Sequence, residues 1–322
     1  MTKATLPTTI ASTSLAIPRL VVATGPDGIR RFVEFFAANI RNANTREAYA
    51  RNVVNFLDWA ESRGVQTLSA IQPIVVAGYI EDLGTAYEAP TVKQHLAAVR
   101  MLFDWLVVGQ IVPSNPASSV RGPKHIVKRG KTPVLTADEA RQLIDSIDIA
   151  TICGLRDRAL IGVRVYSFAR VSAAISMRVE DYFTEGKRWW FRLHEKGGKR
   201  HEIPAHHNAE AYLDAYIEAA KIAGEKRTPL FRTIDRKGYL TARSMTRNDV
   251  LRMVKRRCRA IGLPSTICNH SFRATGITAY LENGGTIENA QAIAAHESPR
   301  TTKLYDRTSD ELTLDEIERI VI

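Results

Sequence analysis

Two long segments in the first third of the chain place apolar residues at helical spacing, and a glycine follows each of them. Spacings of three and four residues put side chains on one face of a helix, so both segments are predicted to be helices that share a core. Asn44 and Glu47 fit a capping box at the start of the first segment, and Gly64 and Gly109 fit helix ends. The apolar positions are Tyr49, Val53, Phe56, Leu57 and Ala60 in the first segment and Val92, Leu96, Val99, Phe103 and Leu106 in the second.

Shorter apolar segments near 27–39 and 72–83 add two expected helices. Together the four predict a helical domain over residues 23–120. The chain has 322 residues, a length that suggests two domains rather than one. Pro7 and Pro18 interrupt the short apolar runs of residues 1–22, so we expect a flexible tail there and not a signal peptide.

The segment "RGPKHIVKRGKTP" at 121–133 contains two prolines, two glycines and five Lys or Arg residues. It is too polar for a core and too punctuated for a helix, so we expect a basic linker, with a solvated loop as the alternative. The formal net charge of +11 favours a polyanionic partner, for which nucleic acid is the usual candidate. The three cysteines are scattered, which argues against a disulfide framework and against a cysteine zinc site. No stretch approaches the ~20 apolar residues of a membrane span.

Residues 134–322 are expected to form a second domain of mixed structure. Thr136 and Glu139 form another capping-box pattern. Two strands, at 188–193 and 200–204, flank a turn at Gly197 and Gly198 and predict a hairpin. Further helices are expected at 207–223, 244–261, 271–282 and 286–295. The fold class is therefore mainly α with a small β-sheet: a helical domain followed by an α+β domain.

The predicted helix at 244–261 separates its apolar and basic residues. Val250, Val254, Cys258 and Ile261 form the apolar stripe, and Arg252, Lys255, Arg256 and Arg259 lie mostly off it. A charged stripe is often a solvated face, but cations of one sign repel one another unless an anion lies alongside. The pattern is compatible with a helix that follows a phosphate backbone.

Four separated fragments contain residues suited to phosphoryl transfer. They are "ARVSAAISM" with Arg170, "EKGGKR" with Lys196, "HSFRATG" with His270 and Arg273, and "HESPRTTKLYDR" with His296 and Tyr305. Singly, each has a structural explanation: an ion pair, a turn, a helix cap or a packed tyrosine. Together they contain the groups that a phosphodiester cleavage needs.

A phosphodiester under attack gathers negative charge on its non-bridging oxygens, and two arginines can hold those oxygens in fork geometry. A tyrosine hydroxyl, with a free pKa of ~10, becomes a nucleophile when a base or nearby cations assist it. A lysine on a hairpin can protonate the leaving oxygen. No carboxylate cluster with metal spacing accompanies the set, and His201, His206 and His207 form no ligand pattern, so no metal and no cofactor are expected.

The order Arg, Lys, His-x-x-Arg, His, Tyr resembles the tyrosine recombinases, also called phage-type integrases, over residues 30–308. "HSFRATGITAYLENG" followed by "IAAHESPRTTKLYDR" carries most of the resemblance, and His296 and Tyr305 are separated by the interval common in that family. The resemblance implies a SAM-like core-binding domain and an α+β catalytic domain. It also implies a site-specific recombinase that cleaves and rejoins DNA through a 3′-phosphotyrosine.

By this resemblance Arg170 and Arg273 clamp the phosphate, and Lys196 is the general acid on the β-hairpin. His270 is the assisting acid or base, His296 lies beside the scissile phosphate, and Tyr305 is the nucleophile. There are departures from the family pattern. The acid usually found three residues after the first arginine is Ala173, so support for Arg170 must come from elsewhere. The common Leu-Gly-His is Ala294-Ala295-His296, and Ala274 follows the second arginine.

The implied partners are double-stranded DNA with an inverted-repeat site and three further copies of the chain, as a homotetramer on DNA. No membrane partner is expected, and the implied location is the cytoplasm, at the nucleoid. Arg46, Lys93, Lys124, Lys128, Arg129, Lys131, Arg252, Lys255 and Arg256 are the expected DNA contacts.

Beyond Tyr305, Thr313 and Glu316 fit the start of a tail helix, with Leu314, Ile317, Ile320 and Val321 as its apolar face. Such a tail can fold on its own domain or dock on a neighbouring copy, and docking on a neighbour is favoured because a head-to-tail contact closes a ring. Two other functions remain open. One is a DNA-binding accessory protein without catalysis, and the other is an activity like that of a type IB topoisomerase.

Overall fold

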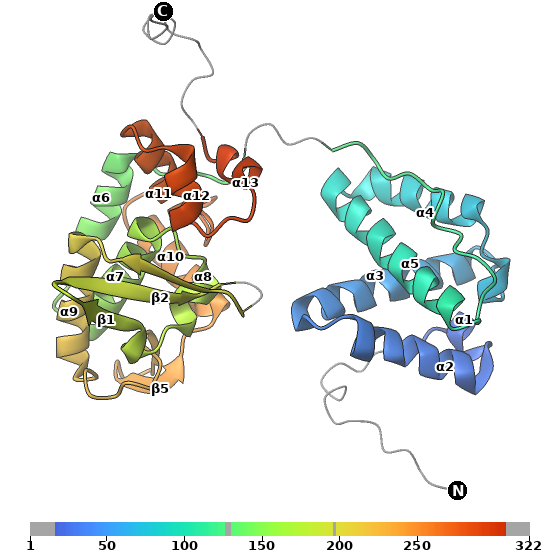
Figure 1. The fold of residues 1–322 in the computed structure, drawn as a ribbon, viewed down its shortest axis with the longest axis horizontal. Coiled ribbons are helices and arrows are strands. Elements are labelled where there is room, and N and C mark those ends of the chain that lie inside the picture. The colour runs from blue at the N-terminus through green and yellow to red at the C-terminus, as the bar shows by residue number, and fades with distance from the viewer. Residues whose placement is uncertain (1–16, 126–129, 196–197, 307–322) are drawn as a thin grey trace, which may run out of the picture. The chain divides into compact units, whose positions relative to one another are not determined.

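The computed structural model describes residues 17–125, 130–195 and 198–306, and the chain divides into two compact units between residues 126 and 127 (Figure 1). This division falls inside the basic segment expected to link the domains. Residues 1–16, Lys128, Arg129, Lys196 and the expected tail helix lie outside the described residues.

The first unit contains the four expected helices around one core. Its elements are α1 (Arg19–Val22), α2 (Gly25–Glu34) with a π-helical continuation η2 (Phe35–Asn39), α3 (Ala43–Ser62), the 3₁₀ turn η3 (Leu68–Ala70), α4 (Pro73–Ala86) and α5 (Ala89–Val108). Phe56 of α3 packs edge-on against Tyr79 of α4, with ring centroids 5.1 Å apart, and against Phe103 of α5. The apolar stripes of the sequence are therefore the faces that meet.

Two details of the first unit differ from the expectations. The residue that caps α3 is Asn42, not Asn44, because the extended backbone of Asn42 lets its side-chain oxygen accept from the backbone N–H of Thr45. Glu47 pairs instead with Arg51, one turn further along the helix. Regular structure also begins before the expected boundary at 23, since α1 buries Leu20 and Val21 in the core of this unit.

The second unit combines helices with two small antiparallel sheets. The helices are α6 (Ala137–Asp145), α7 (Ile152–Tyr166), α8 (Val171–Ser176), η4 (Val179–Asp181), α9 (His207–Ala220), α10 (Arg247–Ala260), α11 (Ser271–Glu282), α12 (Ile287–Ile293) and α13 (Pro299–Lys303). The strands are β1 (Tyr182–Glu185), β2 (Arg188–His194), β3 (Arg200–Pro204), β4 (Arg232–Ile234) and β5 (Leu240–Ser244).

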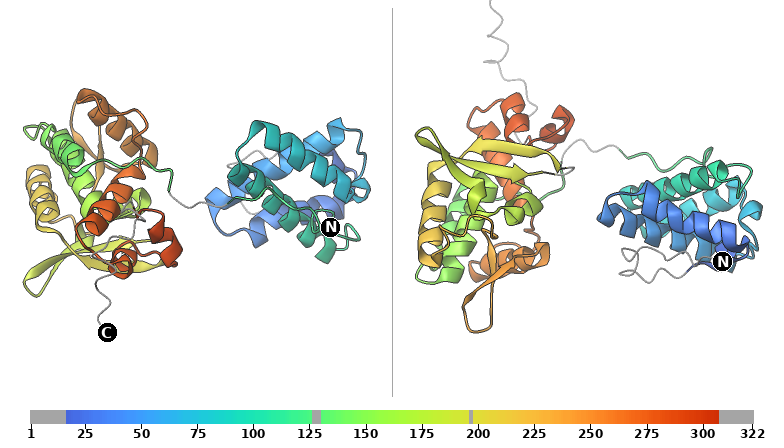
Figure 2. Two further views of the ribbon diagram at one scale, coloured as in Figure 1. Left: turned by 90° about the horizontal axis from the view of Figure 1, so that it is seen from above. Right: turned by 60° about the horizontal axis from the view of Figure 1, so that its bottom comes forward.

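The three-stranded sheet has the order β1-β2-β3 and buries one face against helices, as Figure 1 shows. Phe191 and Leu193 of β2 are fully buried there. The β2–β3 pairing ends at His194 opposite Arg200, so these two strands form the expected hairpin. The β4–β5 hairpin was not expected, and Figure 2 shows it projecting from the unit. It occupies residue 244, so the expected helix at 244–261 begins later, after Thr246, whose capping box uses Asp249.

Asp157 of α7 is the hub of a buried ion-pair network. Its carboxylate is fully buried and accepts from Arg156, Arg256 and Arg257, at N–O distances of 2.6, 3.0 and 2.8 Å. Arg252 pairs with Asp249 at 2.6 Å. Carboxylates of the same chain thus neutralise part of the positive charge of α10. The sequence pattern did not indicate these ion pairs.

Replacing Asp157 with Asn should destabilise the second unit by about 3–5 kcal/mol, because three arginines lose the charge that offsets their partial burial. Asp138→Asn is the matched control, since that carboxylate is 92% exposed in its pair with Arg141 and should change stability by less than about 1 kcal/mol. Urea unfolding of both variants measures the difference. Equal effects would mean that the network contributes no more than a surface pair.

Candidate active site

The second unit brings five of the six expected catalytic residues into one cluster. Arg170 precedes α8, Arg273 lies in α11, and His270 is the residue just before α11. His296 follows α12, and Tyr305 follows α13. Lys196, the sixth, is outside the described residues, but the hairpin that carries it reaches the cluster through Glu195.

Arg273 is almost completely buried and is held by backbone carbonyls. Its Nη1 donates to the carbonyl of Phe168, and its Nη2 donates to the carbonyl of Ala294 at 2.6 Å. Phe168 lies two residues before Arg170, and Ala294 lies two residues before His296. The buried guanidinium therefore fixes the two segments that present those residues.

Two residues at or beside these carbonyls adopt the left-handed backbone conformation that favours glycine. The φ angle is 52° at Phe168 and 48° at Ala295. Each costs about 1–2 kcal/mol for a residue with a side chain. This backbone strain lies at the acceptors of Arg273.

Arg170 pairs with Glu195, whose side chain is only 4% exposed. The Arg170 side chain is 31% exposed, so part of its guanidinium faces solvent. Among the residues that the structure describes, Glu195 is the acceptor recorded for this guanidinium. Sequence reasoning did not single out Glu195, although its position next to Lys196 was visible.

Tyr305 is half-buried and held on several sides. Its carbonyl accepts from the hydroxyl of Thr278 at 2.9 Å, and the carbonyl of Leu304 accepts from the backbone N–H of Gly130 at 2.9 Å. A Cβ at residue 130 would lie 2.7 Å from that carbonyl oxygen, so only glycine fits there. The ring stacks in parallel on His296, with centroids 5.9 Å apart. His296 is itself fixed by Thr302, whose hydroxyl lies 2.9 Å from Nδ1.

Burial, and after it the positive charge of neighbouring arginines, lowers the pKa values of three groups in the cluster. Burial, followed by Arg170, lowers the pKa of Arg273 to about 10, while Glu195 and the Tyr305 hydroxyl act in the opposite direction. Burial, Arg273 and Arg170 lower the pKa of His296 to about 3. Partial burial and the neighbouring arginines also lower the pKa of His270. Both histidines are therefore neutral at pH 7, and the arginines are the cations of the site.

Arg164 is a fully buried cation that the sequence analysis missed. Its Nη2 donates to the carbonyl of Asn269, the residue before His270, while Nε and Nη1 have no hydrogen-bond partner among the described residues. Burial lowers its pKa to about 10. A basic residue within the apolar run "ALIGVRVYSF" was the available signal. Three arginines and one recorded carboxylate, Glu195, leave this region with a surplus of positive charge that suits an anion.

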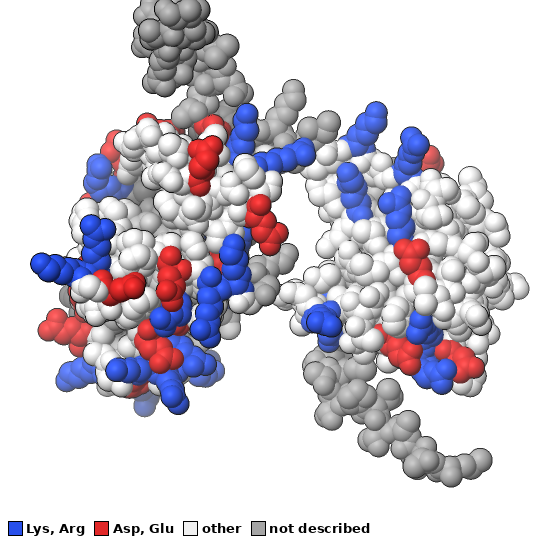
Figure 3. Space-filling view, in the orientation of Figure 1, with Lys and Arg blue, Asp and Glu red and all other residues white. Residues whose placement is uncertain are grey.

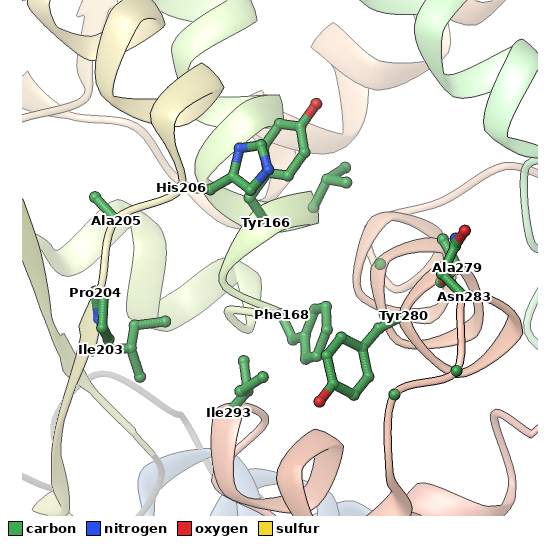
Figure 4. A pocket seen from close by; sticks show the side chains of 14 residues that line it. Tyr166, Phe168, Ile203, Pro204, Ala205, His206, Ala279, Tyr280, Asn283 and Ile293 are labelled. Carbon is green, nitrogen blue, oxygen red and sulfur yellow. Dashed lines mark hydrogen bonds between the residues drawn. The ribbon is translucent and has the colours of Figure 1, made fainter.

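An apolar cavity of about 760 Å³ is lined mainly by residues of α7, β3 and α11. Figure 4 shows Phe168, Tyr280, Ile203 and Ile293 around it. Its lining is mostly apolar, so it suits an apolar segment and not a phosphate. The arginine-rich cluster and this cavity thus differ in chemical character.

The expected DNA contacts remain predictions. Arg46 donates from Nε and Nη2 to the carbonyl of Ile40, and Lys255 donates to the carbonyl of Ser265, so both have partners within the chain. Arg252 and Arg256 take part in the ion pairs described above. Lys93, Lys124 and Lys131 are exposed. Figure 3 shows Lys and Arg side chains on the visible face of each unit, with Asp and Glu among them.

Within the described residues no group of three or more His, Cys, Asp or Glu side chains could hold a metal ion. His201 instead contacts the carbonyl of Ile293, and His206 stacks on Tyr166. None of the helices in the described ranges is both long and apolar enough to cross a membrane.

Family models match both units. The model described as the phage integrase family matches residues 133–311, and the one described as the phage integrase N-terminal SAM-like domain matches residues 29–109. The tyrosine recombinase XerD of Corynebacterium glutamicum is 28% identical over 281 residues, which cover 84% of this chain and 90% of XerD.

Solved structures of low sequence identity share the fold. The XerH site-specific recombinase bound to its difH substrate aligns with a TM-score of 0.65 and 15% identity, over 93% of this chain and 94% of XerH. A lambda integrase tetramer bound to a Holliday junction aligns with a TM-score of 0.65 and 18% identity, over 97% of this chain and 85% of that chain.

The low pKa of His296 predicts a loss of stability in mild acid. Above pH ~6.5, the pKa of an unfolded histidine, the imidazole is neutral in both states. As the pH falls from there towards 3, the unfolded chain binds a proton that the folded chain excludes. Between pH 7.5 and 5.0 the wild-type protein should therefore lose up to about 2 kcal/mol more unfolding free energy than His296→Gln. Urea unfolding at both pH values measures this, and equal losses would contradict the neutral assignment.

Proposed function

The chain belongs to the phage integrase family, whose members are site-specific recombinases, and we propose that it cleaves and rejoins DNA through a covalent link between Tyr305 and a 3′ phosphate. The observation that carries this proposal is the convergence of Arg170, Arg273, His270, His296 and Tyr305 around one positively charged site. The Tyr305 hydroxyl lies close enough to act on the pKa of Arg273. A phosphate bound by that guanidinium would be within reach of the hydroxyl.

In the proposed step the Tyr305 oxygen attacks phosphorus, forms the phosphotyrosine bond and expels the 5′ oxygen of the next nucleotide. Arg170 and Arg273 would stabilise the charge that grows on the non-bridging oxygens. His270, kept neutral by its lowered pKa, can take the proton of the hydroxyl, and Lys196 can protonate the leaving oxygen. Rejoining reverses these transfers with the 5′ hydroxyl of another strand. The scheme needs no metal ion, because arginine and lysine provide the positive charge.

The alternative of a DNA-binding protein without catalysis was suggested by the missing acid at Ala173. That argument weakens because Arg170 pairs with the carboxylate of Glu195. A topoisomerase-like activity shares the chemistry, and tests of strand exchange between two sites would separate it from recombination. A DNA substrate would place the protein in the cytoplasm, at the nucleoid.

Tyr305→Phe should abolish the covalent adduct with a nicked suicide substrate while changing DNA affinity by less than about twofold. The hydroxyl is the nucleophile, whereas affinity comes from dispersed phosphate contacts. Tyr280→Phe is the matched control, because that half-buried tyrosine lines the apolar cavity and should retain cleavage. An adduct formed by the Tyr305→Phe variant would overturn the assignment of the nucleophile.

Lys196→Ala should slow cleavage of ordinary DNA by about 10²–10⁴-fold, the usual contribution of a general acid. On a substrate whose scissile 5′ oxygen is sulfur, the same variant should lose little, because a thiolate leaves without a proton. Single-turnover rates on the two substrates give the comparison. An equal defect on both would assign Lys196 to phosphate or base contact instead.

For assembly, we propose that four copies meet on two inverted-repeat sites and that the C-terminal tail of one copy docks in the apolar cavity of the next. Residues 306–322 follow Tyr305 in the chain, and Leu314, Ile317, Ile320 and Val321 would give a tail helix an apolar face. The lining of the cavity is also mostly apolar, like that face of the tail. The match in chemistry favours the tail, not DNA, as its occupant.

Truncation after Asp310 should reduce cooperative binding to a two-arm site by about tenfold, with less effect on a single arm. Ala279→Arg, which would fill the cavity from α11, should reproduce this loss in the full-length chain. Gel-shift titrations on one-arm and two-arm DNA measure both variants. Unchanged cooperativity would mean that the tail packs on its own domain and that the copies couple through another surface.

A further inference from the structure

Arg170 has no acid on its own helix to hold it. Ala173 occupies the position three residues later, where an acid is usual in the family, and this residue is 1% exposed within the core of the second unit. A long side chain that carries a charge needs a partner to fix its guanidinium before a phosphate arrives. The partner must therefore come from another element.

Glu195 comes from the β2–β3 hairpin, 25 residues further along the chain. Its backbone is fixed at the root of the hairpin loop, since its N–H donates to the carbonyl of Lys199 at 2.8 Å and its carbonyl accepts from Gly198 at 3.2 Å. Its carboxylate is buried next to Arg170. A buried carboxylate costs several kcal/mol unless it is paired, so this geometry is held by both partners.

The pair leaves Arg170 able to bind a phosphate. A guanidinium has five N–H donors in a rigid fork, and Glu195 engages Nη1 from the buried side. The Arg170 side chain remains 31% exposed, so other donors can face an incoming anion. Glu195 thus restricts the rotation of the guanidinium without covering it.

We propose that Glu195 is the positioning residue for Arg170 and replaces, from the hairpin, the acid that is missing at Ala173. This rests on the proposed function, because Arg170 is taken as one of the two phosphate clamps. The same ion pair fastens the root of the hairpin that carries Lys196 to the start of α8. One contact therefore joins the clamp to the hairpin whose next residue is the proposed general acid.

Glu195→Gln keeps the shape of the side chain and removes its charge. Single-turnover cleavage of a suicide substrate should slow by about 10–100-fold, the cost of a misplaced clamp, with DNA affinity unchanged within about twofold. Glu202→Gln is the matched control: this carboxylate lies on the same hairpin, in β3, and pairs with Arg192 at 2.6 Å. Its loss should leave the cleavage rate unchanged.

A double-mutant cycle separates positioning from a general effect on folding. If Glu195 acts through Arg170, Glu195→Gln should slow cleavage by less than about threefold in an Arg170→Lys background, where the fork is already lost. Additive defects would overturn the inference, because Glu195 would then act elsewhere. An unchanged or faster cleavage rate of Glu195→Gln would also overturn the inference. It would mean that the ion pair has no effect on cleavage or that Glu195 competes with the phosphate for Arg170. Failure of the wild-type protein to form any adduct would instead reject the proposed function, and the inference with it.

Discussion

The buried guanidinium of Arg273 is the interaction on which the catalytic unit depends. A cation out of water must have its donors satisfied, and here carbonyls from two distant segments provide the acceptors. One carbonyl precedes Arg170 and the other precedes His296, so satisfying one side chain places two more. The strained backbone at Phe168 and Ala295 is tolerated because it aims these carbonyls inward. The buried guanidinium of Arg273 thus determines both the geometry of the site and much of its positive charge.

Local patterns in the sequence predicted the elements that have one buried face. Helices α3, α5 and α10 and the β2–β3 hairpin follow directly from apolar spacing and turn residues. Helix α7 was missed because it is buried on most sides, and even its charged residues Asp157 and Arg164 are buried. Without an exposed polar face, its sequence does not alternate between apolar and polar residues at helical spacing. The cap at Asn42 was missed because two asparagines lie two residues apart, and only the backbone conformation chooses between them.

The members of the cluster were recognisable in the sequence by residue type and order, whereas a residue that supports another from a distant element was not. Arg170, Arg273 and Tyr305 are recognisable by type and order. Glu195 is not, because its importance comes from a contact across 25 residues that spacing rules cannot show. The Asp157 network is similar, since it joins α7 to α10 across about a hundred residues. Such long-range pairs depend on how the elements pack together. Local sequence patterns carry no information about that packing.

The use of main-chain oxygens around Arg273 affects how a mutational scan of this protein would read. Truncating Phe168 to alanine removes a ring but leaves the carbonyl acceptor in place, and Ala294 has nothing to truncate. An alanine scan would therefore miss both acceptors. Gly130 would score as essential although it has no side chain, because any substituent there meets the carbonyl oxygen of Leu304. At Phe168, Ala294 and Gly130, tolerance to alanine therefore reports whether the backbone is crowded and not whether the main chain supports the site.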